Sequence, residues 1–165
     1  DKNTGIINYL ISLVGIPAVD WLGNPIMAMV SIIMVDVWRM TPWFALLLIS
    51  GIKSISGDTI EAALVDGASK WQCFWHVILP QLYRVLVLVL MMRTIDAFKV
   101  FDIVFVMTGG GPGMATEMLP NYIYAQGLRY FDAGYAAALA LVFIAAMALL
   151  SGVFILVRNR RKQDG

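Results

Sequence analysis

The sequence has few charged residues and almost no cysteine or histidine. Charged residues make up 14% of the 165 residues, whereas soluble proteins average about 25%. The single cysteine, Cys73, cannot form an internal disulfide, and with the single histidine, His76, it leaves too few ligands for a zinc site. A net charge of +1 provides no field to attract nucleic acid. Disulfide scaffolds, zinc enzymes and nucleic-acid-binding proteins are therefore excluded.

Hydrophobic residues, by contrast, make up 60% of the chain and gather in three long runs. Residues 26–52, 82–107 and 133–157 are each long enough to cross about 30 Å of hydrocarbon as a helix. Pro42 inside the first run predicts a kink. A helix satisfies its own backbone in lipid, and three segments cannot close a barrel. We therefore predict an all-α membrane protein, a polytopic bundle with three transmembrane helices in this chain.

The distribution of basic residues predicts the orientation. Seven flank one side of the predicted spans and two the other. The seven are Lys53, Lys70, Arg84, Arg158, Arg160, Arg161 and Lys162; the two are Lys2 and Arg129. The positive-inside rule then places the loop 53–81 and the basic tail 158–165 in the cytoplasm, and the N-terminus outside. An odd number of spans without a signal sequence suggests that further spans precede this chain in a longer parent protein.

Two segments are predicted on the extracytoplasmic side. Residues 1–25 contain apolar residues at helical spacing, too few to span, and are expected to lie at the membrane interface. Residues 108–132 begin with a glycine-rich turn, after which Thr116 and Glu117 predict the cap of a short helix that ends near Arg129.

The loop 53–81 is predicted to form two short helices. Asp58 and Glu61 have the spacing of a capping box, and Gly67 can adopt the left-handed conformation that ends a helix. Residues 68–79 then predict a second, aromatic helix that ends before Pro80. A compact helical elbow with an apolar face is a docking element.

The residues of this loop resemble a known motif. Glu61-Ala62-Ala63, then Gly67 after three residues, then Leu79-Pro80 resemble the EAA loop of the membrane subunits of binding-protein-dependent ABC importers. Val77 replaces the isoleucine of that pattern. Residues 66–74, 108–112 and 134–138 resemble the carbohydrate branch, the maltose and glycerol-phosphate type permeases, although Ser56 stands where that branch often has proline.

The resemblance implies a non-catalytic permease subunit in the inner membrane of a prokaryote that moves a sugar or sugar-like solute. Its expected partners are a second permease subunit, two cytoplasmic ATPase subunits that carry ATP and Mg²⁺, an extracytoplasmic solute-binding protein and the lipid bilayer. No cofactor is expected in this chain. Glu61 would pair with a basic residue of the ATPase. The expected ATPase-coupling residues are Glu61, Ala62, Ala63, Asp66, Gly67 and Ala68. The plainer alternative is that Glu61 only caps its own helix.

Charged residues inside the predicted spans form a second candidate site. They are Asp36, Arg39, Arg93, Asp96, Lys99 and Asp102. Each would cost roughly 2.5–3.5 kcal/mol in contact with lipid, so the set is expected to face protein or water. The last four alternate in sign at steps of three along one predicted helix and are candidates for the substrate path. Internal salt bridges are the alternative. A proton relay is a third hypothesis, although His76 lies in the loop.

Other functions receive little support. The glycines at 109–113 are followed by no Gly-Lys-Ser/Thr and preceded by no strand, so they do not predict a phosphate-binding loop. No set of residues predicts catalysis by this chain. An importer for phosphate or an amino acid remains an alternative, as does an ion-coupled carrier or membrane enzyme. A purely structural role as a membrane anchor would leave the charged residues inside the predicted spans unexplained.

Overall fold

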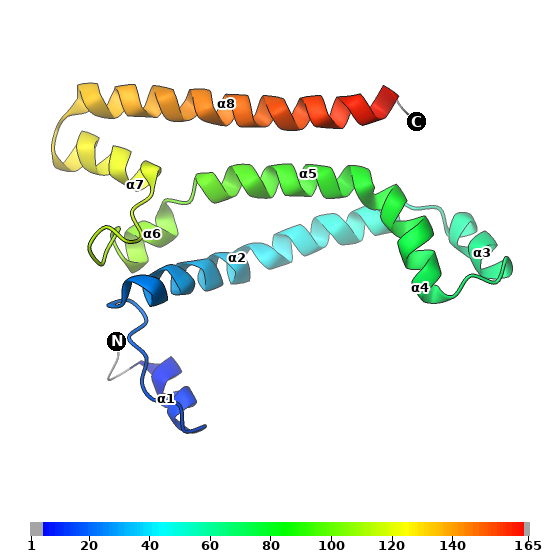
Figure 1. The fold of residues 1–165 in the computed structure, drawn as a ribbon, viewed down its shortest axis with the longest axis horizontal. Helices are drawn as coiled ribbons and strands as arrows, with labels where there is room; N and C mark the ends of the chain where they lie inside the picture. Colours follow the sequence, from blue (N-terminus) through cyan, green and yellow to red (C-terminus); the bar gives the residue numbers. More distant parts are fainter. Residues whose placement is uncertain (1–4, 164–165) are drawn as a thin grey trace. The chain divides into compact units, whose positions relative to one another are not determined.

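The computed structural model describes residues 5–163, with the backbone alone for Arg84 and residues 157–163. This part of the chain contains helices and turns but no strand (Figure 1). The segments are α1 (Ile6–Ser12), α2 (Pro25–Lys53), α3 (Gly57–Val65), α4 (Lys70–Cys73), the π-helical turn η1 (Phe74–Ile78), α5 (Leu79–Phe98), α6 (Asp102–Met107), α7 (Leu119–Tyr124), the π-helical turn η2 (Ala125–Arg129) and α8 (Ala133–Gln163). The predicted all-α fold is confirmed.

Two helices are long and apolar enough to cross a membrane, α2 and residues Ala133–Leu156 of α8. The 29 residues of α2 extend about 43 Å at about 1.5 Å per residue. A third span is reached only if the helical stretches Lys70–Tyr83 and Val85–Met107, which meet at 60°, count as one. No residue in the most apolar window of α8 is buried, so its side chains are available to lipid or to other subunits. The structure thus supports two or three spans.

The chain divides into two compact units. The first consists of residues 1–38 and 99–145, and the second of residues 39–98 and 146–165. The division within α2 falls between Trp38 and Arg39. Pro42 lies inside this helix and has no N–H to donate to the carbonyl of Trp38, four residues earlier. The predicted kink at Pro42 stays a prediction.

The prediction of one continuous helix over 82–107 is wrong. The helix α5 ends at Phe98 and α6 begins at Asp102, with a non-helical connection between them. The break is explained by packing in the first unit, where Val100, Ile103 and Val104 form a buried cluster with Ile32 of α2. Met107 and Met118 pack against this cluster. Burial of these side chains outweighs the continuation of the helix.

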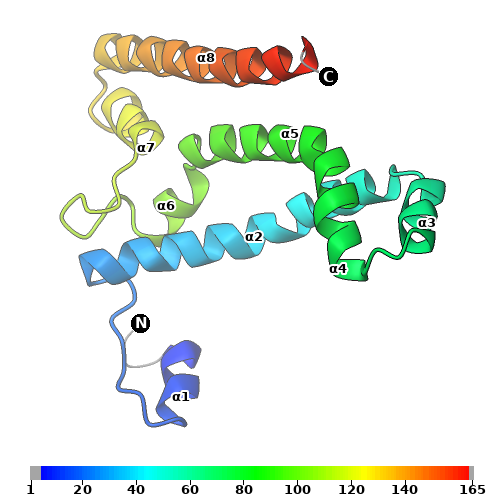
Figure 2. The same ribbon diagram turned by 45° about the vertical axis from the view of Figure 1, so that its right-hand side comes forward.

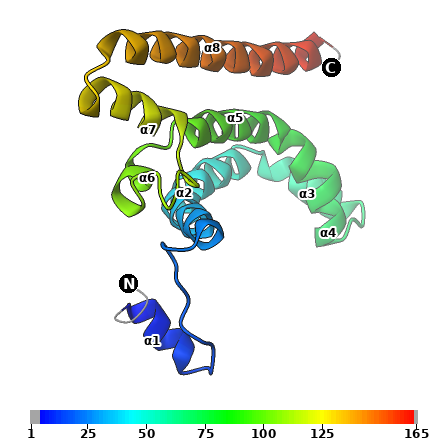
Figure 3. The same cartoon turned by 60° about the vertical axis from the view of Figure 1, so that its left-hand side comes forward.

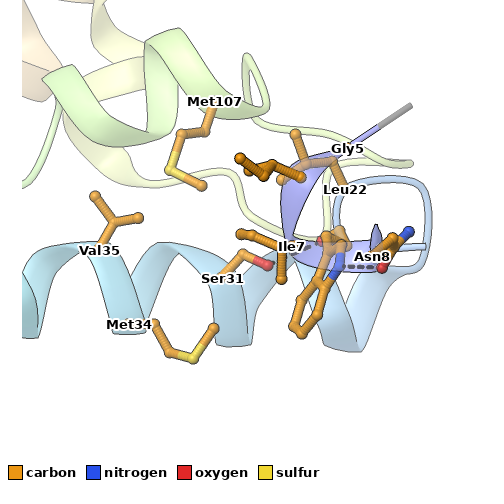
Figure 4. A pocket seen from close by; sticks show the side chains of 10 residues that line it. Gly5, Ile7, Asn8, Leu22, Ser31, Met34, Val35 and Met107 are labelled. Atoms are coloured by element: carbon orange, nitrogen blue, oxygen red, sulfur yellow. Dashed lines mark hydrogen bonds between the residues drawn. The ribbon is translucent and has the colours of Figure 1, made fainter. Parts of the chain in front are cut away.

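The N-terminal helix α1 is shorter than the interfacial segment predicted from the sequence, and residues 1–4 lie outside the described range. It is anchored through Asn8, whose Nδ2 donates to Val19 O at 2.8 Å. Asn8 Oδ1 accepts from Trp21 Nε1 at 2.7 Å and from Val19 N at 3.2 Å. A cavity of about 290 Å³ beside this anchor is lined mainly by apolar side chains of α1, α2 and Met107 (Figure 4).

The chain makes a long turn between α6 and α7 (Figure 3). Two threonines close this turn. The hydroxyls of Thr108 and Thr116 lie 2.7 Å apart, and Thr116 Oγ1 donates to Gly111 O at 2.7 Å. Thr116 is fully buried and does not cap a helix as predicted, because its hydroxyl is bonded within the turn and Met118 is the N-cap of α7. Instead α7 starts at Leu119 after Met118, without a side-chain cap, and η2 ends at Arg129 as the sequence predicted.

The second unit contains a close contact between α2 and α5. A Cβ atom at Gly51 would lie 2.8 Å from Leu82 Cδ1 and 2.9 Å from Val85 Cγ1. Leu82 is buried. The absence of a side chain at Gly51 therefore sets how closely the two helices approach.

We expect Gly51→Val to destabilise the protein by about 1–3 kcal/mol, because it overpacks this contact. The matched control is Gly152→Val, since a Cβ at Gly152 of α8 meets no atom within 4 Å. Thermal unfolding of the purified protein in detergent measures the difference. Equal unfolding midpoints for the two variants would contradict this packing.

Candidate functional site

The helical elbow of the second unit consists of α3, α4 and η1 (Figure 2). Its joint is Gly67, which has φ +86°. Gly67 N donates to Leu64 O at 3.1 Å, and Ala68 N donates to Ala63 O at 3.0 Å. These two bonds are those of a Schellman motif, which ends a helix on a left-handed residue. The predicted role of Gly67 as the helix stop is confirmed.

The predicted capping box at Asp58 and Glu61 is wrong. The N-cap of α3 is Ser56, and no side chain caps this helix. Asp58 instead lies in the first turn of α3, where its negative charge interacts favourably with the positive end of the helix dipole. The alternative interpretation of Glu61 as the partner in its own capping box is therefore excluded.

A capping box does occur at the second helix of the elbow. Ser69 N donates to Gln72 Oε1 at 2.8 Å, and Gln72 N donates to Ser69 Oγ at 3.3 Å. The pair fixes the backbone two residues after the joint at Gly67. The Ser-x-x-Gln spacing at 69–72 is a recognisable signal of this capping box, which was not predicted from the sequence.

The second helix does not end before Pro80 as predicted. It continues through η1 directly into α5, and Pro80 is the second residue of α5. Leu79 N donates to Phe74 O, five residues earlier. This wider turn tolerates the missing N–H of Pro80 and relieves the clash of its ring with the preceding turn. The elbow is thus joined to α5 by a helical run without a loop, and this run bends by 60° between Tyr83 and Val85.

The surface of the elbow carries large apolar side chains. Trp71 is 70% exposed and Val65 is 87% exposed. The ring of Trp71 lies 6.2 Å from that of Phe74 and 5.7 Å from that of Trp75, measured between centroids. Clustered exposed apolar residues mark an interaction surface.

The expected coupling residues lie on this surface. Glu61, Ala62, Asp66 and Gly67 are exposed, and Ala63 and Ala68 are half-buried. The two alanines at 62 and 63 leave room for close approach of another protein. The elbow therefore presents an acidic residue, a small-residue patch and an aromatic cluster on neighbouring turns.

The six charged residues do not share one compact unit. Asp36, Lys99 and Asp102 belong to the first unit, and Arg39, Arg93 and Asp96 to the second. The expected row on one helix is interrupted, because Lys99 follows α5 and Asp102 is the first residue of α6. Each of the six makes a polar or electrostatic contact. Asp36 is buried, Arg93 and Asp96 are half-buried, and the other three are exposed. Both the salt-bridge and the substrate-path hypotheses stay open.

A third polar region, which the sequence reasoning missed, surrounds Asn121 of α7. Asn121 is 5% exposed and lines a cavity of about 210 Å³ with Glu117 and Arg129. No spacing of residues in the sequence points to this site, because its members come from a helix, a turn and a π turn. Among residues 5–163, no group of three or more potential metal-ligating side chains is gathered.

Comparison with known proteins places this geometry in a family. Residues 6–163 match the family described as "Binding-protein-dependent transport system inner membrane component". The chain belongs to this family. The match includes the whole elbow and both candidate spans, and it confirms the resemblance that the EAA loop indicated.

Two relatives of this inner membrane component illustrate the match. The trehalose/maltose transport system permease protein of Thermococcus litoralis is 40% identical over 158 residues, which cover 95% of this chain and 52% of the relative. The sulfoquinovosyl glycerol transport system permease protein of Agrobacterium fabrum is 35% identical over 151 residues, covering 92% and 49%. The chain thus spans about half the length of these relatives.

A solved structure shares the fold. It is a bacterial ABC transporter involved in the import of the acidic polysaccharide alginate, with a TM-score of 0.87 and 22% identity. The alignment covers 96% of this chain and 56% of the other. The helical arrangement of the inner membrane component is therefore kept at low sequence identity.

The joint of the elbow is testable with a matched pair of variants. A Cβ at Gly67 or at Gly57 meets no atom within 4 Å, but only Gly67 has a positive φ. Gly67→Ala should destabilise the elbow by about 1–2 kcal/mol through its left-handed backbone, whereas Gly57→Ala should not. Hydrogen–deuterium exchange of residues 57–78 measures the difference. Equal protection in both variants would contradict the conformational role of Gly67.

Proposed function

We propose that this chain is part of the permease subunit of an ATP-driven importer for a sugar or sugar-like solute. The observation that carries the proposal is the exposed elbow, in which a fixed joint at Gly67 presents Glu61 and a small-residue patch. Membership of the inner membrane component family supports it. The sugar substrate is supported by two relatives, which are permease proteins of trehalose/maltose and sulfoquinovosyl glycerol transport systems.

In the proposed mechanism the elbow fits a cleft on a cytoplasmic ATPase subunit. The capping box at Ser69 and the Schellman motif at Gly67 fix the angle between α3 and α4. Because α4 continues through η1 into α5, force applied to the elbow acts on α5 without passing through a loose connection. Rocking of packed helices around a fixed solute site is the general basis of alternating access.

The proposed assembly contains partners on both sides of the membrane. Two ATPase subunits bind ATP and Mg²⁺ in the cytoplasm, a second permease subunit completes the path, and a solute-binding protein delivers the sugar outside. The chain itself hydrolyses nothing. The basic residues around the elbow and in the tail support a cytoplasmic elbow and a cytoplasmic C-terminus. The side chains of the tail lie outside the described residues.

Glu61→Ala should abolish ATP-driven sugar uptake while the protein stays in the membrane, because it removes the proposed partner of a basic residue on the ATPase. The control is Asp58→Ala, which removes an exposed carboxylate from the same helix one turn earlier. Uptake of a labelled sugar by cells, normalised to membrane protein, measures the effect. Uptake by Glu61→Ala at the level of Asp58→Ala would contradict the coupling role.

The charged residues require a different measurement. If they line the solute path, Arg93→Gln and Asp96→Asn should raise the half-saturating sugar concentration several-fold while ATPase binding stays unchanged. Uptake kinetics and co-purification with the ATPase distinguish the two effects. Unchanged kinetics in both variants would favour the salt-bridge hypothesis instead.

A further inference from the structure

The elbow has two arms, and the arm formed by α4 and η1 exposes three aromatic rings. We call residues 70–78 the aromatic arm. Trp71 is 70% exposed, Trp75 is 47% exposed and Phe74 is 37% exposed. The rings of Phe74 and Trp75 meet edge to face with centroids 5.4 Å apart, and both lie beside the ring of Trp71. Because Cys73 of the same arm is buried, the arm has one packed side and one continuous apolar surface.

The two arms differ in charge. On α3 and at the joint, Asp58, Glu61 and Asp66 are exposed, and residues 57–69 contain no Lys or Arg. Residues 67–95 contain no Asp or Glu, and the aromatic arm carries the exposed Lys70. A basic surface that pairs with α3 therefore finds no complementary charge on the aromatic arm. An anionic surface does.

The connection to α5 holds the aromatic arm near the membrane face. The helical stretches Lys70–Tyr83 and Val85–Met107 meet at 60°, and Figure 2 shows α4 turned away from α5. When α5 runs along the membrane normal, the stretch Lys70–Tyr83 lies closer to the membrane plane than to the normal. The predicted transmembrane helix that contains α5 begins at residue 82, so the arm starts at the edge of the hydrocarbon.

The depth of the rings follows from helix geometry. Trp75 precedes Tyr83 by about 12 Å along the helix, at about 1.5 Å per residue. At an inclination of 60°, about half of this distance is depth, which places Trp75 about 6 Å outside the hydrocarbon. The headgroup region of one leaflet is about 5–7 Å thick. The exposed rings therefore lie at headgroup level, where tryptophan is enriched in membrane proteins.

We propose that the aromatic arm lies in the headgroup region of the cytoplasmic leaflet and binds anionic phospholipid. The rings of Trp71 and Trp75 pack against the glycerol and upper acyl groups, and the ammonium group of Lys70 pairs with a lipid phosphate. The proposal rests on the proposed function, because it takes the elbow as cytoplasmic and α3 as the arm that contacts the ATPase. The bilayer then supports one arm while the ATPase moves the other.

A photo-reactive residue tests this proposal in the intact importer, with its ATPase and second permease subunits, in lipid nanodiscs. Replacement of Trp71 by p-benzoylphenylalanine keeps an aromatic side chain, which on irradiation forms a bond to a neighbouring C–H group. Mass spectrometry should identify lipid as the main adduct. The matched control places the same residue at Leu64, which is exposed on α3 and should give an ATPase adduct instead.

Lipid charge provides the second measurement. In nanodiscs that mix phosphatidylcholine with about 30% phosphatidylglycerol, the share of phosphatidylglycerol among the lipid adducts at position 71 should be roughly twice its share of the bilayer. Lys70→Gln should return it to the bilayer share. The control is Arg129→Gln, which removes one positive charge from the predicted opposite side of the membrane.

The same replacement at Trp75 provides a second variant if the one at position 71 does not assemble. Adducts with the ATPase or the second permease subunit, no adduct at either position, or phosphatidylglycerol adducts in proportion to the bilayer would each overturn the lipid site. Equal lipid adducts at positions 71 and 64 would overturn the division of the elbow into two arms. Failure of the proposed function shows differently, because position 64 would then give no ATPase adduct.

Discussion

The hydrogen-bonding demand of the peptide backbone in an apolar solvent governs this structure. Unpaired N–H and C=O groups cost several kcal/mol each in hydrocarbon, so a membrane chain must satisfy them within its own segments. The described residues form helices over most of the predicted spans, although the connection 99–101 between α5 and α6 is not helical. The π turns η1 and η2 continue helical runs near the predicted membrane faces. Even Pro80, which lacks an N–H, lies within a helical run that continues from α4 into α5.

The same demand explains why much of the fold was predictable. Long apolar runs identify α2 to within one residue at each end, and they identify the start of α8, although that helix continues six residues past Val157 to Gln163. Such runs have few other stable states in lipid. Gly67 was also predictable, because only glycine adopts a left-handed backbone without cost. These features depend on local chemistry that the sequence displays directly.

Features that depend on tertiary packing were not predictable. The helix predicted over 82–107 breaks because Val100 and Val104 are buried with Ile32. No local sequence pattern predicts this contact. Thr116 resembles a helix cap, but its hydroxyl bonds to Gly111 across the turn. For the candidate sites, the EAA motif identified the surface residues of the elbow. The polar region around Asn121 could be identified only from the structure.

The π turn η1 also fixes the rotational phase between the elbow and α5. Successive residues of an α-helix are offset by about 100° around the axis, and a π turn accommodates one residue more than an α turn. The extra residue between Phe74 and Ile78 therefore sets the azimuth at which Trp71 emerges relative to the side chains of α5. A homologue that lost one residue here would be almost equally hydrophobic, yet its aromatic cluster would point about a quarter-turn away from the present direction.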